Sequence, residues 1–154
     1  MLALAGFVGL SLLVGVADAG FMASSLPTWF HSLARPLGTP PDWLFGPVWA
    51  VLYALMGVSA WLIWREQDAA PRRTFAALRL WGWQLLLNAA WTPAFFGLRS
   101  PAAGLVVVLL LLALILLTII AFRRLNSRAS VLLLPYAAWV VYVIYLNAGI
   151  VVLN

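Results

Sequence analysis

The chain has 154 residues, of which 66% are hydrophobic and only 8% are charged, and its mean hydropathy is +1.05. Soluble domains are about 45–50% apolar and about 25% charged, so this composition excludes an ordinary water-soluble domain and indicates an integral membrane protein. The net charge of +5 comes from arginines spread over loops and helix ends, which argues against nucleic-acid binding, and the lack of cysteine excludes disulfides and cysteine-ligated metals.

Five segments are long and apolar enough to cross the hydrocarbon core of a bilayer, which is about 30 Å thick and takes roughly 20 residues. They span about 2–22, 43–64, 74–97, 101–122 and 130–153, and the long connection 23–42 joins the first two. The sequence therefore predicts an all-α membrane protein, a single domain over 1–154 built as a five-transmembrane-helix bundle.

The first segment could instead be a signal peptide, because residues 17–19 imitate a small-residue cleavage site. A signal peptide begins with a basic region, and this chain has none there. Ser11, Gly15 and Ala19 recur every four residues on one helical face, a spacing that lets helix backbones approach closely. We therefore interpret the segment as a membrane helix, with Asp18 near its outer, wetted end.

Arginines concentrate in the second and fourth connections, on the side that holds the N-terminus: Arg65, Arg72, Arg73, Arg123, Arg124 and Arg128. The opposite side has only Arg35 and Arg99. Connections rich in basic residues stay in the cytoplasm, so the N-terminus is predicted inside and the C-terminus outside. Connection 23–42 is then an outer loop, and two prolines restrict its backbone just before the second helix.

Most of the nine tryptophans fall where an interfacial aromatic belt belongs. These six are Trp29, Trp43, Trp61, Trp64, Trp81 and Trp83. Trp49, Trp91 and Trp139 lie deeper, the first two roughly 9 Å below the outer ends of their helices at 1.5 Å per residue. Position alone is compatible with simple core packing of these three rings.

Polar side chains accompany the deep tryptophans. Asn88 lies one helical turn from Trp91, Tyr53 lies one turn from Trp49, and Asn147 is a further amide in the last segment. An amide in hydrocarbon needs a partner or a cavity, and an aromatic cavity with a few polar groups is typical of a site for a large, flat, apolar ligand. The alternative, that the asparagines only hydrogen-bond across helices, stays equally open.

Conventional catalytic and metal-binding patterns are missing. The acidic residues fall near segment ends or in loops, and the one histidine, His31, lies in the first connection, so no Ser/His/Asp triad and no metal site are expected. His31 could ligate haem iron, but a lone loop histidine is more often hydrogen-bonded at the surface.

Five spaced motifs, from residue 29 to the C-terminal part of the chain, resemble those of the TspO/translocator-protein family, which includes the peripheral-type benzodiazepine receptor and the tryptophan-rich sensory proteins. The motifs are W-F-H-S-L-A-R-P at 29–36, P-P-D-W at 40–43, F-G-P-V-W with L-Y-A-L-M-G at 45–57, Q-L-L-L-N with W and F-F-G at 84–97, and P-Y with W and L-N at 135–147. The resemblance implies a five-helix bundle, often dimeric, that binds porphyrins and benzodiazepine-type ligands in a cavity closed by the first loop.

The same resemblance implies the residues of the site. Trp49, Asn88 and Trp139 match the ligand-contacting residues of the family. The residues that match its pocket wall and lid are Tyr53, Trp91, Phe30 and Pro41.

Three positions depart from the family pattern. Gly38 stands where the family has a tryptophan, which puts the lid in doubt, and Val143 stands where it usually has alanine, which narrows the pocket. Ala148 stands where the sterol-recognition pattern needs an aromatic residue, so cholesterol binding is not expected.

The leading hypothesis is a sensor or regulator, a homodimer in a bacterial cell membrane, that binds a tetrapyrrole such as protoporphyrin IX as its ligand and requires no cofactor. An alternative is an enzyme that degrades bound porphyrin with light and oxygen, with Trp49 and Trp139 as redox participants. A tetrapyrrole transporter is a third hypothesis, although the chain lacks the internal repeats of secondary transporters. A purely structural membrane scaffold is the fourth.

Overall fold

The computed structural model describes the backbone of residues 1–154 and every side chain except those of residues 24–27. The long helices are α1 (Leu2–Ser25), α2 (Asp42–Trp64), α3 (Pro71–Thr92), α4 (Pro101–Arg123) and α6 (Leu134–Leu153). Three short elements complete the chain: α5 (Ser127–Leu132) and the π-helical turns η1 (Leu26–Phe30) and η2 (Pro93–Gly97). The described backbone contains no strand, so the all-α prediction is confirmed.

Four helical stretches are long and apolar enough to cross a membrane: Leu2–Ala23, Asp42–Trp64, Pro101–Arg123 and Ser127–Leu153. Helix α3 has a similar length of 22 residues, but its arginines and amides make it less apolar than the other four. The protein is therefore an integral membrane protein, whereas membrane crossing by α3 stays a prediction.

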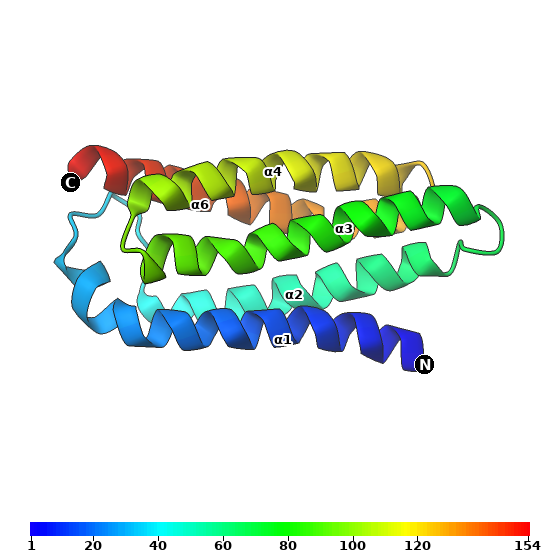
Figure 1. Ribbon diagram of the computed structural model, residues 1–154, viewed down its shortest axis with the longest axis horizontal. Coiled ribbons are helices and arrows are strands. Elements are labelled where there is room, and N and C mark those ends of the chain that lie inside the picture. The colour runs from blue at the N-terminus through cyan, green and yellow to red at the C-terminus, as the bar shows by residue number, and fades with distance from the viewer.

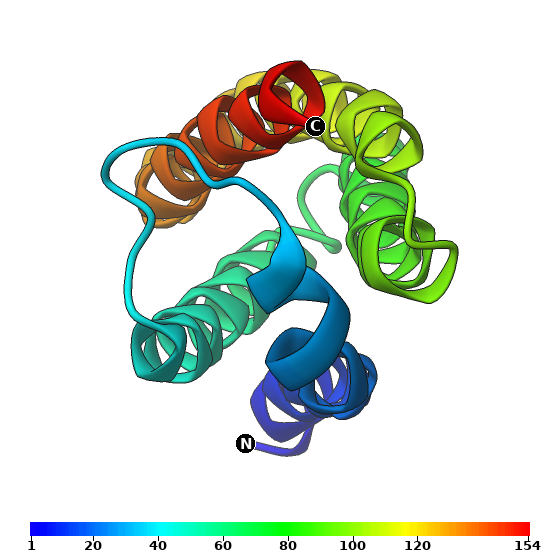
Figure 2. The ribbon, with the colours of Figure 1, turned by 90° about the vertical axis from the view of Figure 1, so that its left-hand side faces the viewer.

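The long helices lie side by side in an elongated bundle, with the N-terminus and the C-terminus at opposite ends (Figure 1). Helix α1 packs mainly on α2, α3 on α4, and α4 on α6. Seen from the C-terminal end, the segment that follows η1 arches across the end of the bundle before it enters α2 (Figure 2). This segment is positioned to cover whatever lies between the helices at that end.

Helices α1 and α2 approach closely because two glycines leave room between them. A Cβ atom at Gly57 would lie 2.5 Å from the Cα of Val8, and one at Gly15 would lie 2.6 Å from the ring of Tyr53. Gly15 belongs to the predicted small-residue face of the first helix, so the predicted role of that face is confirmed at this position.

Helix α1 is longer than predicted. It ends at Ser25 and passes directly into η1, so the non-helical part of the predicted connection 23–42 shrinks to residues 33–41. The prediction ended the helix at about Met22, after the roughly 20 residues that a membrane crossing needs, yet each added residue of a formed helix gains one hydrogen bond and needs no apolar side chain. Asp18 consequently lies farther from the helix end than expected.

Prolines explain the other differences in helix boundaries. Helix α3 begins at Pro71 rather than at 74, because proline is favoured in the first turn of a helix. It gives way to η2 at Pro93, which has no backbone N–H to continue the regular pattern. The predicted helix 130–153 is two helices, α5 and α6, which are separated at Leu133. Pro135 lies in the first turn of α6, a position that proline favours.

Candidate functional site

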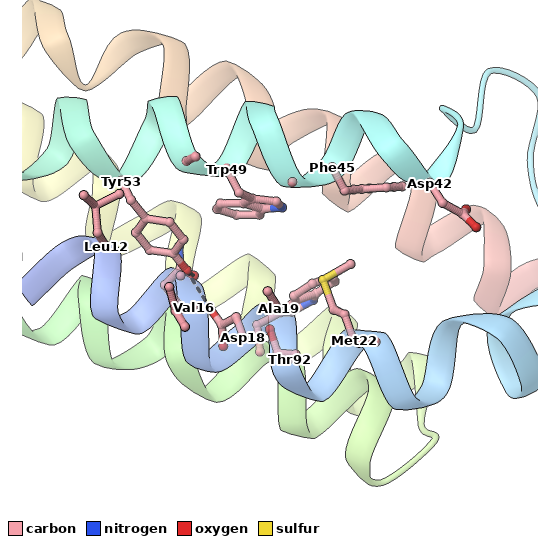
Figure 3. Close-up of a pocket in the computed structure, with 16 residues that line it drawn as sticks. Leu12, Val16, Asp18, Ala19, Met22, Asp42, Phe45, Trp49, Tyr53 and Thr92 are labelled. Carbon is pink, nitrogen blue, oxygen red and sulfur yellow. Dashed lines mark hydrogen bonds between the residues drawn. The ribbon is translucent and has the colours of Figure 1, made fainter.

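A cavity of about 380 Å³ lies between α1, α2 and α3 (Figure 3). Small-molecule sites usually have volumes of about 300–1,000 Å³. The rings of Phe45, Trp49 and Trp91 form part of the wall. Val16 of α1 and Ala50 of α2 also line the cavity although both are exposed, so the cavity reaches the protein surface between these two helices.

A buried polar cluster joins four helices beside the cavity. The hydroxyl oxygen of Tyr53 lies 2.6 Å from Oδ2 of Asp18 and 2.7 Å from Oδ1 of Asn88. Asn88 in turn places Nδ2 at 2.5 Å from the hydroxyl of Tyr136 in α6, and the hydroxyl of Thr92 hydrogen-bonds Asp18. In Figure 3, Asp18 and Tyr53 point toward each other across the gap between α1 and α2.

The protonation of Asp18 is coupled to the direction of these hydrogen bonds, since a tyrosine hydroxyl has a single hydrogen to donate. When Asp18 is ionised, Tyr53 donates to it, and Asn88 must turn its amide so that its NH₂ donates to Tyr53. When Asp18 is protonated, it can donate to Tyr53, which is then free to donate to Oδ1 of Asn88. A change at the carboxyl group can therefore reverse the donors along the cluster as far as Tyr136.

A second cavity, of about 30 Å³, adjoins the first, because Phe45, Trp49 and Trp91 line both. Phe30 of η1, Thr39 of residues 33–41 (the covering segment) and Val143 of α6 line the smaller one. The smaller cavity thus lies between the covering segment and α6. Val143, predicted to narrow the pocket, belongs to this narrow part.

Trp139 and Pro41 line neither of these cavities. The Trp139 ring centroid is 6.3 Å from that of Phe45, which lines both cavities, and 5.3 Å from that of Tyr142. The sequence predicts that Trp49 and Trp139 share a cavity, and of these two rings only that of Trp49 lines the two described here. Pro41 is exposed and precedes the first residue of α2.

The two asparagines differ in their surroundings. Asn147 donates to the backbone carbonyl of Pro101 at 2.7 Å and accepts from Nε1 of Trp91 at 3.4 Å, so it bonds across helices as the simpler interpretation predicts. Asn88 also bonds across helices and lines the larger cavity, whereas Asn147 lines the smaller one. Asn88 is therefore the amide that a ligand can reach from that cavity.

His31 lies at the rim of the site, where its Nε2 is 2.7 Å from Oδ2 of Asp42. Both side chains are exposed, at 45% and 40%, so the prediction of a hydrogen-bonded surface histidine is confirmed. Asp42 also lines the larger cavity. The pair therefore connects the residue after η1 to the first residue of α2, beside the cavity.

Residues 33–41 are fastened to α6. Gly38 adopts a left-handed conformation with φ of 83°, which favours glycine over a residue with a side chain. Tyr142 donates to the carbonyl of Gly38, and Tyr145 donates to the carbonyl of Leu37 at 3.0 Å. Gly38, which departs from the family pattern, thus supports an ordered covering segment here.

Two further contacts hold the same segment at the C-terminal end of α6. Pro36 packs on Gly149, where a Cβ atom would lie 2.7 Å from the proline ring. The side chain of Asn154 accepts from the backbone N–H of Ala34 and donates to its carbonyl, both at 3.0 Å. The covering segment is therefore attached to α6 along its length rather than only at its ends.

Sequence reasoning missed three polar residues that the structure places in or behind the cavity wall: Asp18, Thr92 and Tyr136. Asp18 was expected at a wetted helix end. Its spacing of three residues from Gly15 puts both on one helical face, and this was the available signal that Asp18 faces α2. No comparable signal in one sequence connects Tyr136 to Asn88, because that contact depends on how α6 is rotated against α3.

Residues 7–153 match the model of the TspO/MBR family. A tryptophan-rich protein TspO from Chlorobaculum tepidum is 39% identical over 158 residues, which cover 100% of this chain and 97% of the relative. A translocator protein from Bos taurus is 35% identical over 92% of this chain and 84% of the relative. A tryptophan-rich sensory protein from Cereibacter sphaeroides is 33% identical over 82% of this chain and 77% of the relative.

Proposed function

Because the chain belongs to the TspO/MBR family, we propose that it is a membrane sensor or regulator that binds a porphyrin of the protoporphyrin IX type. The observation that carries the proposal is the cavity of about 380 Å³ between α1, α2 and α3. Its indole walls suit a flat, apolar ring, and its opening between α1 and α2 lets such a ring enter edge first. Trp49, Trp91, Tyr53 and Asn88 are then the contacting residues.

Titration with protoporphyrin IX in a mild detergent tests the proposal through quenching of tryptophan emission. We expect saturable quenching, and the Trp49→Phe variant should bind about fivefold more weakly, since one aromatic contact is worth about 1 kcal/mol. Trp83→Phe is the matched control, because Trp83 is 56% exposed and lines neither described cavity. An emission spectrum that stays unchanged at micromolar porphyrin would refute porphyrin binding.

A second candidate function is degradation of the bound porphyrin by light and oxygen. Trp49 favours it, because its ring lies 5.6 Å from the ring of Tyr53, whose hydroxyl touches the carboxyl group of Asp18. An oxidisable indole beside a phenol with a proton acceptor provides a route for coupled electron and proton transfer. Trp139, the other proposed redox residue, lines neither described cavity but contacts Phe45, which lines both.

Illumination of the complex in air separates the enzyme from a simple binding protein. Catalysis predicts oxygen-dependent bleaching of the porphyrin absorption that is lost in Trp49→Phe at saturating porphyrin. Trp139→Phe should have the smaller effect, because its ring lies outside the cavity lining. Bleaching at the same rate in the wild type, in both variants and in protein-free micelles would exclude the enzymatic function.

The proposal includes five membrane crossings with the N-terminus inside and the C-terminus outside. The termini at opposite ends of the bundle support it (Figure 1). The excess of arginine in the connections at the end of the bundle that holds the N-terminus also supports it. Since the chain has no cysteine, a single introduced cysteine can be labelled without background. An impermeant maleimide should label Ser32→Cys on intact cells and Asp68→Cys only after permeabilisation, and the reverse pattern would refute the orientation.

The proposal also includes a homodimer in a bacterial cell membrane, which rests on the family resemblance alone. Sedimentation equilibrium in a density-matched detergent measures the protein mass of the assembly. We expect twice the chain mass of 16.8 kDa, and a single chain mass over the whole concentration range would refute the dimer.

A further inference from the structure

Asp18 is a buried carboxyl group that lacks a cationic partner. Its side chain lines the larger cavity and the residue is only 9% exposed. Its hydrogen-bond partners are the hydroxyls of Tyr53 and Thr92, and neither carries a charge. The one ion pair among the described side chains joins His31 and Asp42 at the exposed rim, so none of the described arginines pairs with Asp18.

Such a carboxyl group favours a positively charged neighbour. A buried charge is costly unless an opposite charge or enough hydrogen bonds compensate for it. A carboxylate has about four positions that accept hydrogen bonds, and two hydroxyls leave some of them unused. Because Asp18 is part of the cavity wall, a ligand is the molecule that can fill these positions.

The aromatic rings around Asp18 favour the same class of ligand. Trp49, Tyr53 and Trp91 line the cavity together with the carboxyl group, and Figure 3 shows Trp49 and Tyr53 one turn apart on α2, facing α1. The faces of indole and phenol rings attract cations, and cages of such rings bind ammonium groups. A carboxyl group within an aromatic wall is therefore complementary to a cationic nitrogen on an apolar molecule.

We propose that Asp18 is a specificity-determining residue of the cavity, which binds the basic or N–H-donating nitrogen of a planar aromatic ligand and disfavours a carboxylate at the same place. The inference rests on the proposed function, since it takes the cavity to be the ligand site. For a tetrapyrrole, it predicts the orientation of the acidic groups: the propionates point away from Asp18. The cavity therefore distinguishes ligands by charge as well as by shape.

Three ligands with one ring system test the inference: cationic 9-(aminomethyl)anthracene, neutral 9-methylanthracene and anionic anthracene-9-carboxylate. Their dissociation constants are measured at pH 7 in a neutral detergent by quenching of tryptophan emission. Asp18→Asn keeps the shape of the side chain and an oxygen for Tyr53 but removes the charge. Asp68→Asn is the control, since Asp68 is an exposed carboxyl group that lines neither described cavity.

We expect the wild type to bind the cation at least about tenfold more tightly than the anion, because a buried hydrogen bond to a charged group is worth that factor or more. Asp18→Asn should lose this preference while it binds the neutral ligand within about twofold of the wild type, and Asp68→Asn should keep the preference. An equal change for all three ligands in Asp18→Asn would overturn the inference. So would a wild type without charge preference, a result that does not depend on whether the variant folds.

A protoporphyrin IX titration of the same samples distinguishes failure of this inference from failure of the proposed function. Charge discrimination among the anthracenes without porphyrin binding would refute the proposed tetrapyrrole ligand, while the role of Asp18 in the preference for cationic ligands would stand. Porphyrin binding without charge discrimination would refute the role of Asp18 and leave the proposed function.

Discussion

Replacement of Gly57 by alanine tests the close packing of α1 on α2, which forms one wall of the cavity. The new Cβ atom would lie 2.5 Å from the Cα of Val8 and 2.8 Å from the carbonyl oxygen of Phe7. Ordinary contacts begin at 3.4 Å, so α1 must move away by roughly 1 Å, the difference between 3.4 and 2.5. Both neighbouring atoms belong to the backbone and cannot turn aside, and overpacking of this kind costs about 1–3 kcal/mol.

Gly82→Ala is the matched control, since Gly82 is also inside a helix but a Cβ atom there would meet nothing within 4 Å. Alanine raises helix propensity by about 1 kcal/mol in both variants, so this gain cancels in the comparison. We expect the free energy of unfolding, measured by circular dichroism during titration of mixed micelles with dodecyl sulfate, to be about 1–3 kcal/mol lower for Gly57→Ala than for Gly82→Ala.

The position of α1 also determines the width of the cavity, so Gly57→Ala should weaken protoporphyrin binding while Gly82→Ala should not. Equal stability of the two variants, within about 0.3 kcal/mol, would contradict the packing of α1 described above. The pairing of α1 with α2 would then have to be looser than the structure shows.

Three further substitutions give measurable outcomes. Tyr53→Phe removes the hydroxyl that contacts Asp18 at 2.6 Å and Asn88 at 2.7 Å, so the free energy of unfolding should fall by about 1–3 kcal/mol; an unchanged value would show that the polar cluster adds no stability. Gly38→Ala forces an alanine to φ of 83° at a cost of about 1–2 kcal/mol, and hydrogen exchange of residues 33–41 should accelerate. Unaltered exchange would mean that the covering segment does not depend on this turn. Gly104→Ala places a Cβ atom 2.7 Å from the ring of Phe95, so the melting temperature should decrease, and an increase would contradict the packing of α4 on η2.

The membrane helices and part of the site could be predicted because both depend on distances along the chain. Apolar runs of about 20 residues identify the spans without knowledge of their neighbours. Trp49 and Tyr53 are one turn apart on one helix, as are Asn88 and Trp91, so each pair shares a face wherever the helix lies. All four residues line the cavity between α1, α2 and α3.

The remaining features depend on how helices are rotated and how far they extend. Asp18 enters the cavity wall because α1 is rotated so that this residue meets Tyr53 of α2, and hydropathy does not reveal that rotation. Trp139 lines neither described cavity whereas its neighbour Phe45 lines both, and hydropathy carries no information on which of two neighbouring rings reaches a cavity. Such contacts between helices require the packed structure.

The opening of the cavity between α1 and α2 affects how any binding constant of this protein is interpreted. Exposed residues on this lateral side, such as Val16 and Ala50, contact acyl chains in a bilayer, so a ligand that arrives there has first dissolved in the membrane. The concentration that governs occupancy is the mole fraction of ligand in the lipid or detergent phase. Two molecules with equal contacts in the cavity will thus differ in apparent affinity by the ratio of their partition coefficients, and dilution with empty micelles will lower occupancy even at constant total ligand.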